Sequence, residues 1–264
     1  MRSRFATVVV VALSMVGLLF AAQARAAAEI HRFNVVLSAN PTSVDGGDFN
    51  KFIDFINKTA LEPNGNEAIK HVDFTWAFDI EGRYFVRPNF AVDAGVSQIR
   101  AVQNKEYLPA IGQSYNIKAQ VITVPVHVGA AYYMQPYNQG DFQARAFLGA
   151  GLEQYTYTRA TFETIALGPS VPISNNNKVS VTQDSPGYYL EGGAHMFFAS
   201  HYSVLLSVLY RKGTLRMAQY DQITQSREDV PLPNTPSYAQ NVKGNPYTID
   251  VSGAGVRMAV AIGF

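Results

Sequence analysis

Apolar and charged side chains fall on opposite parities along residues 72–84. Val72, Phe74, Trp76, Phe78 and Ile80 occupy even positions, and every charged residue of the segment occupies an odd one. Successive side chains of a β-strand point to opposite faces, so this pattern predicts a strand with one apolar and one charged face. The same alternation predicts strands near residues 30–39, 71–85, 90–100, 120–134, 142–159, 187–198, 202–213 and 248–264. Pro125 interrupts one of them and predicts a β-bulge, because proline lacks the N–H that a strand ladder needs.

The connections between the eight predicted strands alternate in length. Residues 86–89, 135–141 and 199–201 form short connections, whereas residues 40–70, 101–119, 160–186 and 214–247 form long ones. Barrels of bacterial outer membranes have short periplasmic turns and long external loops in this alternation. We therefore predict an all-β fold, an eight-stranded antiparallel up-and-down transmembrane β-barrel with both mature termini on the periplasmic side.

The charged face is expected to line the barrel interior. It carries Gly, Ala, Ser and Thr with a few opposed charges, whereas a face in contact with water would be rich in Lys and Glu. Small residues suit the narrow interior that eight strands enclose. The charges predicted to form this lumen network are Arg32, Asp73, Asp79, Glu81, Arg83, Asp93, Arg145, Glu153, Glu191, Arg211 and Arg257.

Six acids and five arginines in this set predict mutual pairing, because an unpaired buried charge is costly. Glu191, Arg211 and Arg257 fall near mid-height on three consecutive strands. We expect Glu191 or Asp79 to form a charge-assisted hydrogen bond with Arg211 or Arg257 and to block a continuous water path. The alternative is a gate whose ion pairs break to open a pore.

The first residues have the form of a secretion signal. Arg2 and Arg4 precede an apolar run over residues 6–22, and residues 24–26 form a small-x-small cleavage site, with residues 26–28 as a rival. We expect a signal peptide over residues 1–26 and one outer-membrane barrel domain over residues 27–264.

Composition excludes several classes of protein. Cleavage after Ala26 removes three arginines and no acid, so the 21 Lys and Arg fall to 18 against 20 acidic residues. This balance gives no basic footprint for nucleic acid. The chain has no cysteine, which excludes disulfides and thiolate metal sites. No cofactor is expected.

The first long connection carries a helical pattern. Phe49, Phe52, Ile53 and Ile56 recur at helical spacing after Asp48, a candidate N-cap, and Pro63 with Gly65 ends the pattern. We expect a short helix packed over the barrel mouth by its apolar face. The alternative is an interfacial helix, or an entry site for apolar molecules.

The chain at this point resembles a known family. Its eight strands, the turn sequence over residues 84–90 and the terminal Phe264 are similar to the small outer-membrane barrels related to OmpA, OmpX and OmpW. The last strand also resembles the signal that the barrel-assembly machinery reads, with Val256, Met258, Val260, Ile262 and Phe264 at alternate positions. The resemblance implies outer-membrane location, external long loops, and contact with outer-membrane lipid and lipopolysaccharide.

Function is less specified than location, because such barrels serve many purposes. We expect a monomeric, non-enzymatic protein with a structural or surface-interaction role through its external loops, whose external ligand is unknown. The first alternative is a narrow channel for small apolar molecules, as in OmpW. The second is an acyl hydrolase acting on lipid A, because His201 and Ser203 resemble part of the motif of barrel-shaped deacylases. The motif breaks at Val204 and lies at a predicted periplasmic turn.

Two further histidines are expected to face the lumen. His127 and His195 lack the spacing of metal ligands, so we assign them to hydrogen bonding within the lumen and predict no metal site.

Overall fold

The computed structural model describes residues 31–110, 113–139, 142–168, 171–198, 201–216, 218–225, 228–229 and 243–264. The predicted signal peptide and both of its cleavage sites lie outside the described residues. No helix among the described residues is long and apolar enough to cross a membrane.

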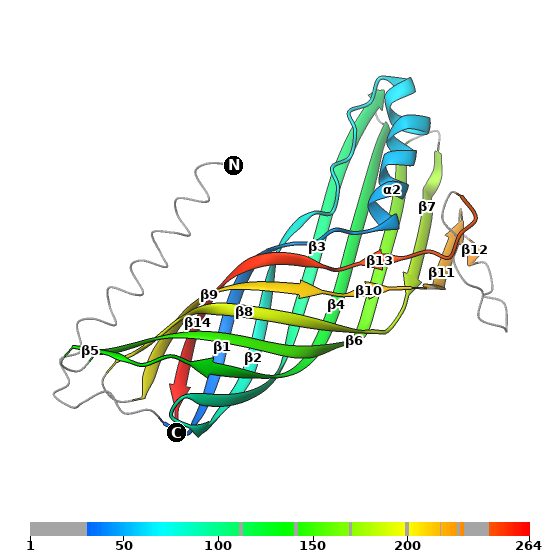
Figure 1. Cartoon of the computed structure of the whole chain (residues 1–264). Coiled ribbons are helices and arrows are strands. Elements are labelled where there is room, and N and C mark those ends of the chain that lie inside the picture. The colour runs from blue at the N-terminus through cyan, green and yellow to red at the C-terminus, as the bar shows by residue number, and fades with distance from the viewer. Residues whose placement is uncertain are drawn as a thin grey trace.

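Eight antiparallel strands form a closed barrel (Figure 1). They are β1 (Phe33–Ser43), β2 (Phe74–Arg87), β3 (Phe90–Ala110), β4 (Gln113–Tyr133), β6 (Phe142–Gly168), β8 (Ser185–Phe197), β9 (Tyr202–Lys212) and β14 (Gly253–Gly263). Each pairs with the next along the chain, and β14 returns to pair with β1, where Val36 lies opposite Ala261. The predicted eight-stranded up-and-down barrel is confirmed.

Apolar side chains cover the outside of this barrel. Phe78, Val128, Leu148, Leu190 and Val208 come from five strands, and each exposes more than half of its surface. Their neighbours in sequence point inward and are polar or small, as the alternation predicts. The outer face is therefore the lipid-facing surface that the pattern indicates.

Three strands are much longer than a membrane crossing requires. β3 and β4 each have 21 residues and β6 has 27, whereas about ten residues of a tilted strand cross a bilayer. Figure 1 shows these strands rising beyond the others, at the end that carries helix α2 (Asp48–Ile56). The expected loops at 101–119 and 160–186 are thus largely strand, which corrects the prediction.

Three of the remaining strands extend this tall sheet. β7 (Val171–Thr182) pairs with the upper half of β6, β11 (Gln219–Gln225) pairs with β7, and β12 (Glu228–Asp229) pairs with β11. β10 (Thr214–Leu215) pairs with β13 (Ile249–Asp250), and β5 (Tyr137–Gln139) pairs with the start of β6.

The bulge predicted at Pro125 is present and changes the wall above it. Val124 lies opposite Tyr157 and Pro125 opposite Tyr155, so Thr156 has no partner residue on β4. The extra residue moves the inward positions of β6 from odd to even numbers: Tyr155 is buried below the bulge, and Ala160 above it.

Above the bulge the inner surface becomes apolar. A buried cluster there includes Ala101, Ile117, Ala119, Ala160 and Phe162 of the tall sheet. Polar residues such as Asn104, Glu106 and Lys118 occupy the outer face of the same strands and are at least partly exposed. The tall sheet thus has the polarity of a sheet in water, opposite to that of the barrel below.

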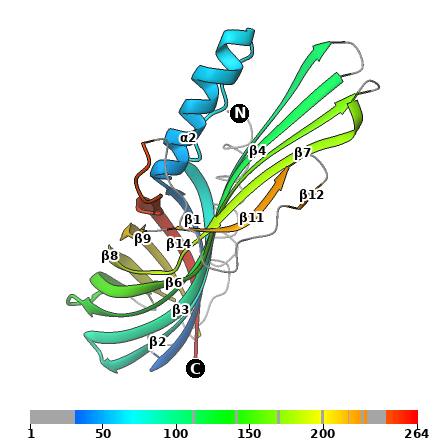
Figure 2. The ribbon, with the colours of Figure 1, turned by 90° about the vertical axis from the view of Figure 1, so that its right-hand side faces the viewer.

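Helix α2 covers this apolar surface. Phe49 and Ile53 are buried within the same cluster, Phe52 and Ile56 pack against it, and the ring of Phe52 meets that of Phe162 edge-on. Figure 2 shows the helix beside the tall strands, at the opposite end of the molecule from the C-terminus. The expected packing over the mouth by the apolar face is confirmed.

The helix ends differ in part from the prediction. Gly47 is the N-cap, and Asp48 is the first helical residue, whose carboxylate accepts hydrogen bonds from the amide and hydroxyl of Thr248. The helix continues through a π-helical turn, η1 (Asn57–Leu61), and a 3-10 turn, η2 (Glu62–Asn64). Gly65, at φ 72°, ends it in the left-handed conformation that glycine favours.

Two asparagines bind the returning chain to the helix. Asn57 Nδ2 donates to the Ile69 carbonyl and its Oδ1 accepts from the Ile69 amide, both at 2.9 Å. Asn50 forms the same pair of bonds with Val72, at 3.4 and 2.9 Å. These buried amides give the segment 66–73 the backbone partners that a strand ladder would otherwise supply.

We predict that Asn57→Leu will loosen this segment without disturbing the barrel. The change leaves the buried Ile69 amide and carbonyl unpaired, at a cost of about 1–3 kcal/mol for each group. Hydrogen exchange should become faster at Ile69, while the urea midpoint of barrel unfolding stays constant. Lys58→Gln, at the exposed neighbouring residue, is the control. Unchanged exchange at Ile69 would contradict the assigned role.

Candidate functional site

The centre of the barrel interior holds one arginine shared by three carboxylates. Arg257 on β14 donates from Nη2 to Asp79 Oδ2 at 2.7 Å and to Glu81 Oε2 at 2.8 Å. Its Nη1 donates to Glu191 Oε1 at 3.2 Å, and its Nε donates to the hydroxyl of Ser38 at 3.2 Å. These contacts join β14, β2, β8 and β1 across the lumen. The predicted bond from Glu191 or Asp79 to Arg257 is therefore confirmed.

A second arginine lies beside the first. Arg83 Nε donates to Glu81 Oε1 at 2.8 Å, and its Nη2 lies 3.5 Å from Glu191 Oε2. Glu81 and Glu191 each contact both Arg83 and Arg257, so the cluster alternates in charge. The two arginines and two glutamates are at most 5% exposed, which makes separation of any pair costly.

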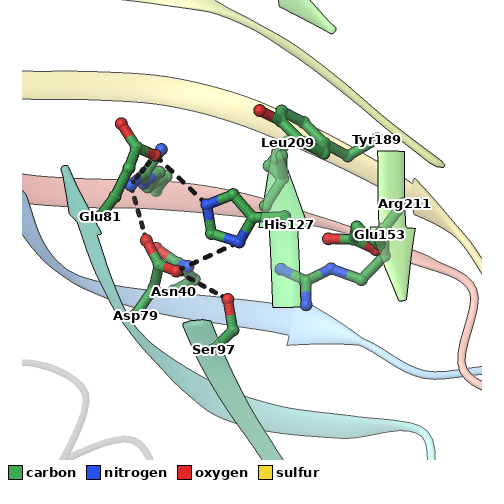
Figure 3. Close-up of a pocket in the computed structure, with 10 residues that line it drawn as sticks. Asn40, Asp79, Glu81, Ser97, His127, Glu153, Tyr189, Leu209 and Arg211 are labelled. Atoms are coloured by element: carbon green, nitrogen blue, oxygen red, sulfur yellow. Dashed lines mark hydrogen bonds and ion pairs between the residues drawn. The ribbon is translucent and has the colours of Figure 1, made fainter. Parts of the chain in front are cut away.

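Asp79 and Glu81 also approach His127 (Figure 3). His127 Nδ1 lies 3.8 Å from Asp79 Oδ1, and Nε2 lies 3.6 Å from Glu81 Oε2. The three residues are close enough to hold a metal ion. The Arg257 guanidinium already contacts both carboxylates, so a metal would bring two cations together at one site. This donor set does not fit a resident metal.

A hydrogen-bonded chain continues toward the short turns. Arg83 Nη1 donates to the Tyr133 hydroxyl at 2.7 Å, which lies 3.1 Å from His195 Nδ1. His195 Nε2 lies 2.8 Å from Ser203 Oγ, and the imidazole stacks on the ring of Phe197. The lower interior is thus filled by side chains that bond to one another.

Arg211 departs from the prediction. It is 2% exposed, Nη1 has no hydrogen-bond partner, and no carboxylate lies within ion-pair distance among the described residues. It lines a small cavity with Glu153 and Asn40, whose Oδ1 is also without a partner (Figure 3). The cavity offers about 20 Å³ to the centre of a water molecule, room for about one water.

Glycines make room for a tyrosine in the lumen wall. Tyr189 donates to Asp93 Oδ1 at 2.5 Å, and its ring lies against the backbones of Gly129 and Gly151. A Cβ at either glycine would collide with the ring or hydroxyl of Tyr189. Tyr133 and Tyr189, and the serines that bond the carboxylates, all occupy the inward parity, so the alternation alone would have identified them.

Nine of the eleven predicted lumen charges are buried inside the barrel: Asp79, Glu81, Arg83, Asp93, Arg145, Glu153, Glu191, Arg211 and Arg257. Arg32 and Asp73 are exposed, which corrects the prediction. Each lies just before a strand begins, where alternation no longer fixes the direction of a side chain. Arg145 lies at the short-turn end, where it donates to the Gln143 side chain and the Pro88 carbonyl.

A closed barrel with an apolar outside and an ion-paired inside defines a transmembrane β-barrel protein. The chain belongs to the outer membrane protein beta-barrel domain family, whose model matches residues 11–227. The protein is therefore assigned to the outer membrane. Among curated proteins, none matches the chain in sequence.

Several solved barrels resemble the structure at low similarity. Neisserial surface protein A has 10% identity and a TM-score of 0.41, with 88% of this chain and 97% of that one covered. Ail of Yersinia pestis has 12% identity and a TM-score of 0.33, covering 89% and 98%. The outer membrane protease OmpT of Escherichia coli has 8% identity and a TM-score of 0.34, covering 88% and 96%. Such distant likenesses say nothing of this chain's activity.

We predict that Gly151→Ala will destabilise the barrel by about 1–3 kcal/mol through overpacking. The new methyl group would meet the Tyr189 ring and lie 2.5 Å from the Val128 carbonyl oxygen. Urea unfolding in lipid vesicles measures the change. Gly149→Ala is the matched control, because a Cβ there lies at 3.4 Å or more from its neighbours. Equal stability of the two variants would contradict the assigned packing.

Proposed function

We propose that this protein is a non-enzymatic outer-membrane barrel with a closed lumen, which acts through the tall sheet and helix at its outer end. The observation that carries the proposal is the cluster of Arg257 with Asp79, Glu81 and Glu191 across the interior. In this proposal both mature termini are periplasmic, and the tall end faces the environment.

The closed lumen supports a role outside the barrel. An eight-stranded barrel is only wide enough for its side chains, and here buried ion pairs connect three strands at mid-height while a hydrogen bond to Ser38 adds a fourth. Buried pairs of this kind are costly to separate, because each partner would remain charged without water or a counter-charge to solvate it. A static plug is therefore favoured over a gate.

The packing of the outer half argues against a conduit for apolar molecules. Such a conduit needs an open apolar chamber, and the apolar surface above the bulge is covered by Phe49 and Ile53 of helix α2. Asn50, Asn57 and Asp48 anchor the helix to neighbouring segments through buried or partly buried hydrogen bonds.

The geometry of His201 and Ser203 argues against acyl hydrolysis. His201 is exposed and stacks on His31, while Ser203 is 3% exposed and bonds to His195. Ser203 thus has a histidine partner, but burial of both side chains leaves no approach for an acyl ester. The pair also lies at the short-turn end, away from the leaflet that carries lipid A in the proposed orientation.

The tall sheet offers a surface for interaction. β6 has 27 residues, which span about 90 Å along the strand, far more than the hydrocarbon thickness of a membrane. Polar residues on its outer face and the helix on its inner face make this part suitable for contact with water and with partners. A chain that needed only to span the membrane would have no use for it.

We predict no conductance above the lipid baseline for the purified protein in planar bilayers, and no change in the acylation of added lipid A. Glu191→Ala removes one carboxylate from the plug and should give small steps that favour anions, because Arg83 and Arg257 remain. Single-channel recording and mass spectrometry of the lipids measure both properties on one preparation.

Two outcomes would overturn the proposal. Steady conductance of the unmodified protein would favour the channel, and loss of acyl chains that depends on Ser203 would favour the enzyme. Ser207→Ala serves as the control for Ser203→Ala, because its hydroxyl is also buried and bonded, to Glu191 Oε1 at 2.6 Å.

A further inference from the structure

The ladder of the barrel wall stops between β8 and β9 at the tall end. The ladder between β8 and β9 ends at Tyr188 opposite Lys212, and the ladder between β7 and β11 begins at Thr182 opposite Gln219. Between these pairs, Ser185 Oγ donates to the carbonyl of Thr214 at 3.2 Å. The two neighbouring strands therefore separate over several residues.

A hollow of about 490 Å³ lies at this break, within the range of small-molecule sites. The residues that give it chemical character are Asp184, Ser185, Tyr188, Lys212, Thr214 and Arg216. They come from both sides of the break, so the hollow exists because the ladder stops.

The hollow lies directly above the lipid-facing surface. Leu190 and Tyr188 on β8, and Val208 and Tyr210 on β9, follow one another up the outer face and are 42–60% exposed. The next outward position on β9 is Lys212. A ligand in the hollow would thus meet the wall where apolar side chains give way to charged ones, at the level of lipid head groups.

The two cations of the hollow, Lys212 and Arg216, differ in their partners. Lys212 Nζ lies 3.3 Å from Asp250 Oδ2, which also accepts a hydrogen bond from the Thr214 hydroxyl at 3.2 Å. Burial opposes ionisation of Asp250, but hydrogen bonds from Ser252 and the charge of Lys212 hold its pKa below the usual range. Arg216 is exposed and forms no ion pair with the residues that the structure describes.

The side chains that line the hollow favour one chemical class of ligand over others. Lys212 and Arg216 provide charge-assisted donors for a phosphate, which an apolar ligand would leave unpaired. Asp184, exposed on the same hollow, disfavours a bare anion but accepts hydrogen bonds from hydroxyl groups. Tyr188 adds an aromatic face. A ligand that carries both a phosphate and sugar hydroxyls satisfies all of these groups.

We propose that this hollow binds the phosphorylated sugar head group of an outer-leaflet lipid. The phosphate meets Arg216 and Lys212, the sugar hydroxyls meet Asp184 and Ser185, and the acyl chains lie along the apolar face below Tyr188. This inference goes beyond the proposed function and rests on its orientation of the tall end toward the outer leaflet.

The test uses the purified full chain in dodecyl maltoside micelles, so that its outcome does not depend on orientation. Native mass spectrometry measures retention of lipid A, the phosphorylated and acylated disaccharide. Lys212→Gln/Arg216→Gln should weaken retention by about ten-fold or more, because two charge-assisted contacts are lost. Asp184→Asn should weaken it less. Arg100→Gln is the matched control, since Arg100 is an exposed arginine on the outer face of β3.

The competitors identify the ligand class. Dephosphorylated lipid A should bind the parent protein about as weakly as phosphorylated lipid A binds the double variant. Neither inorganic phosphate nor phosphatidylglycerol should displace lipid A from the parent protein. Equal retention by the double variant and by Arg100→Gln would overturn the proposal, provided that circular dichroism shows both to be folded. Displacement by phosphatidylglycerol at equal concentration would also overturn it, in favour of a site for any anionic lipid. Neither result bears on whether the lumen conducts ions, so failure of this proposal is distinct from failure of the proposed function.

Discussion

The structure depends on one buried guanidinium, that of Arg257. It faces three carboxylates in a space too narrow for bulk water, and it reaches side chains of β1, β2 and β8 from β14. Water cannot solvate these charges individually, so each needs the others to remain ionised in the interior. Arg83 completes the arrangement by contacting the same two glutamates. The same contacts thus fill the lumen and link four strands.

Above this cluster the same sheet changes its character. The extra residue at Thr156 moves the inward positions of β6, and the inner surface turns from polar to apolar. Above the membrane this apolar inner surface would be in contact with water. The amphipathic helix α2 in the first connection covers it. The break between β8 and β9 begins at about the same level, where Gly187 and Gly213 accommodate the ring of Tyr155. One region of the wall therefore divides a membrane barrel from an exposed sheet.

The alternation of side chains predicted the barrel, its closure and most of the interior charges, because parity is fixed wherever a strand separates lipid from the lumen. It did not predict the tall sheet. There the polarity of the two faces reverses, as at Ala119 inside and Lys118 outside, and the segments looked like loops. It predicted mutual pairing of the interior charges, but Arg211 lies opposite Tyr189, two positions from the partner of Glu191, and its guanidinium lines the cavity with Glu153. Asp48 had the residue type of an N-cap, yet Gly47 is the N-cap, and the Asp48 carboxylate accepts hydrogen bonds from Thr248 instead.

The most direct test of this account is a mutant cycle on the central cluster, measured as the free energy of urea unfolding in lipid vesicles. Arg257→Met should cost about 3–5 kcal/mol, because it leaves Asp79 buried without its arginine and leaves Glu81 and Glu191 with Arg83 alone. Adding Asp79→Asn to Arg257→Met should recover part of that loss, so the double variant should be more stable than the sum of the single changes allows. Strictly additive costs, or an Arg257→Met protein as stable as the parent, would contradict the claim that this shared guanidinium holds the interior together.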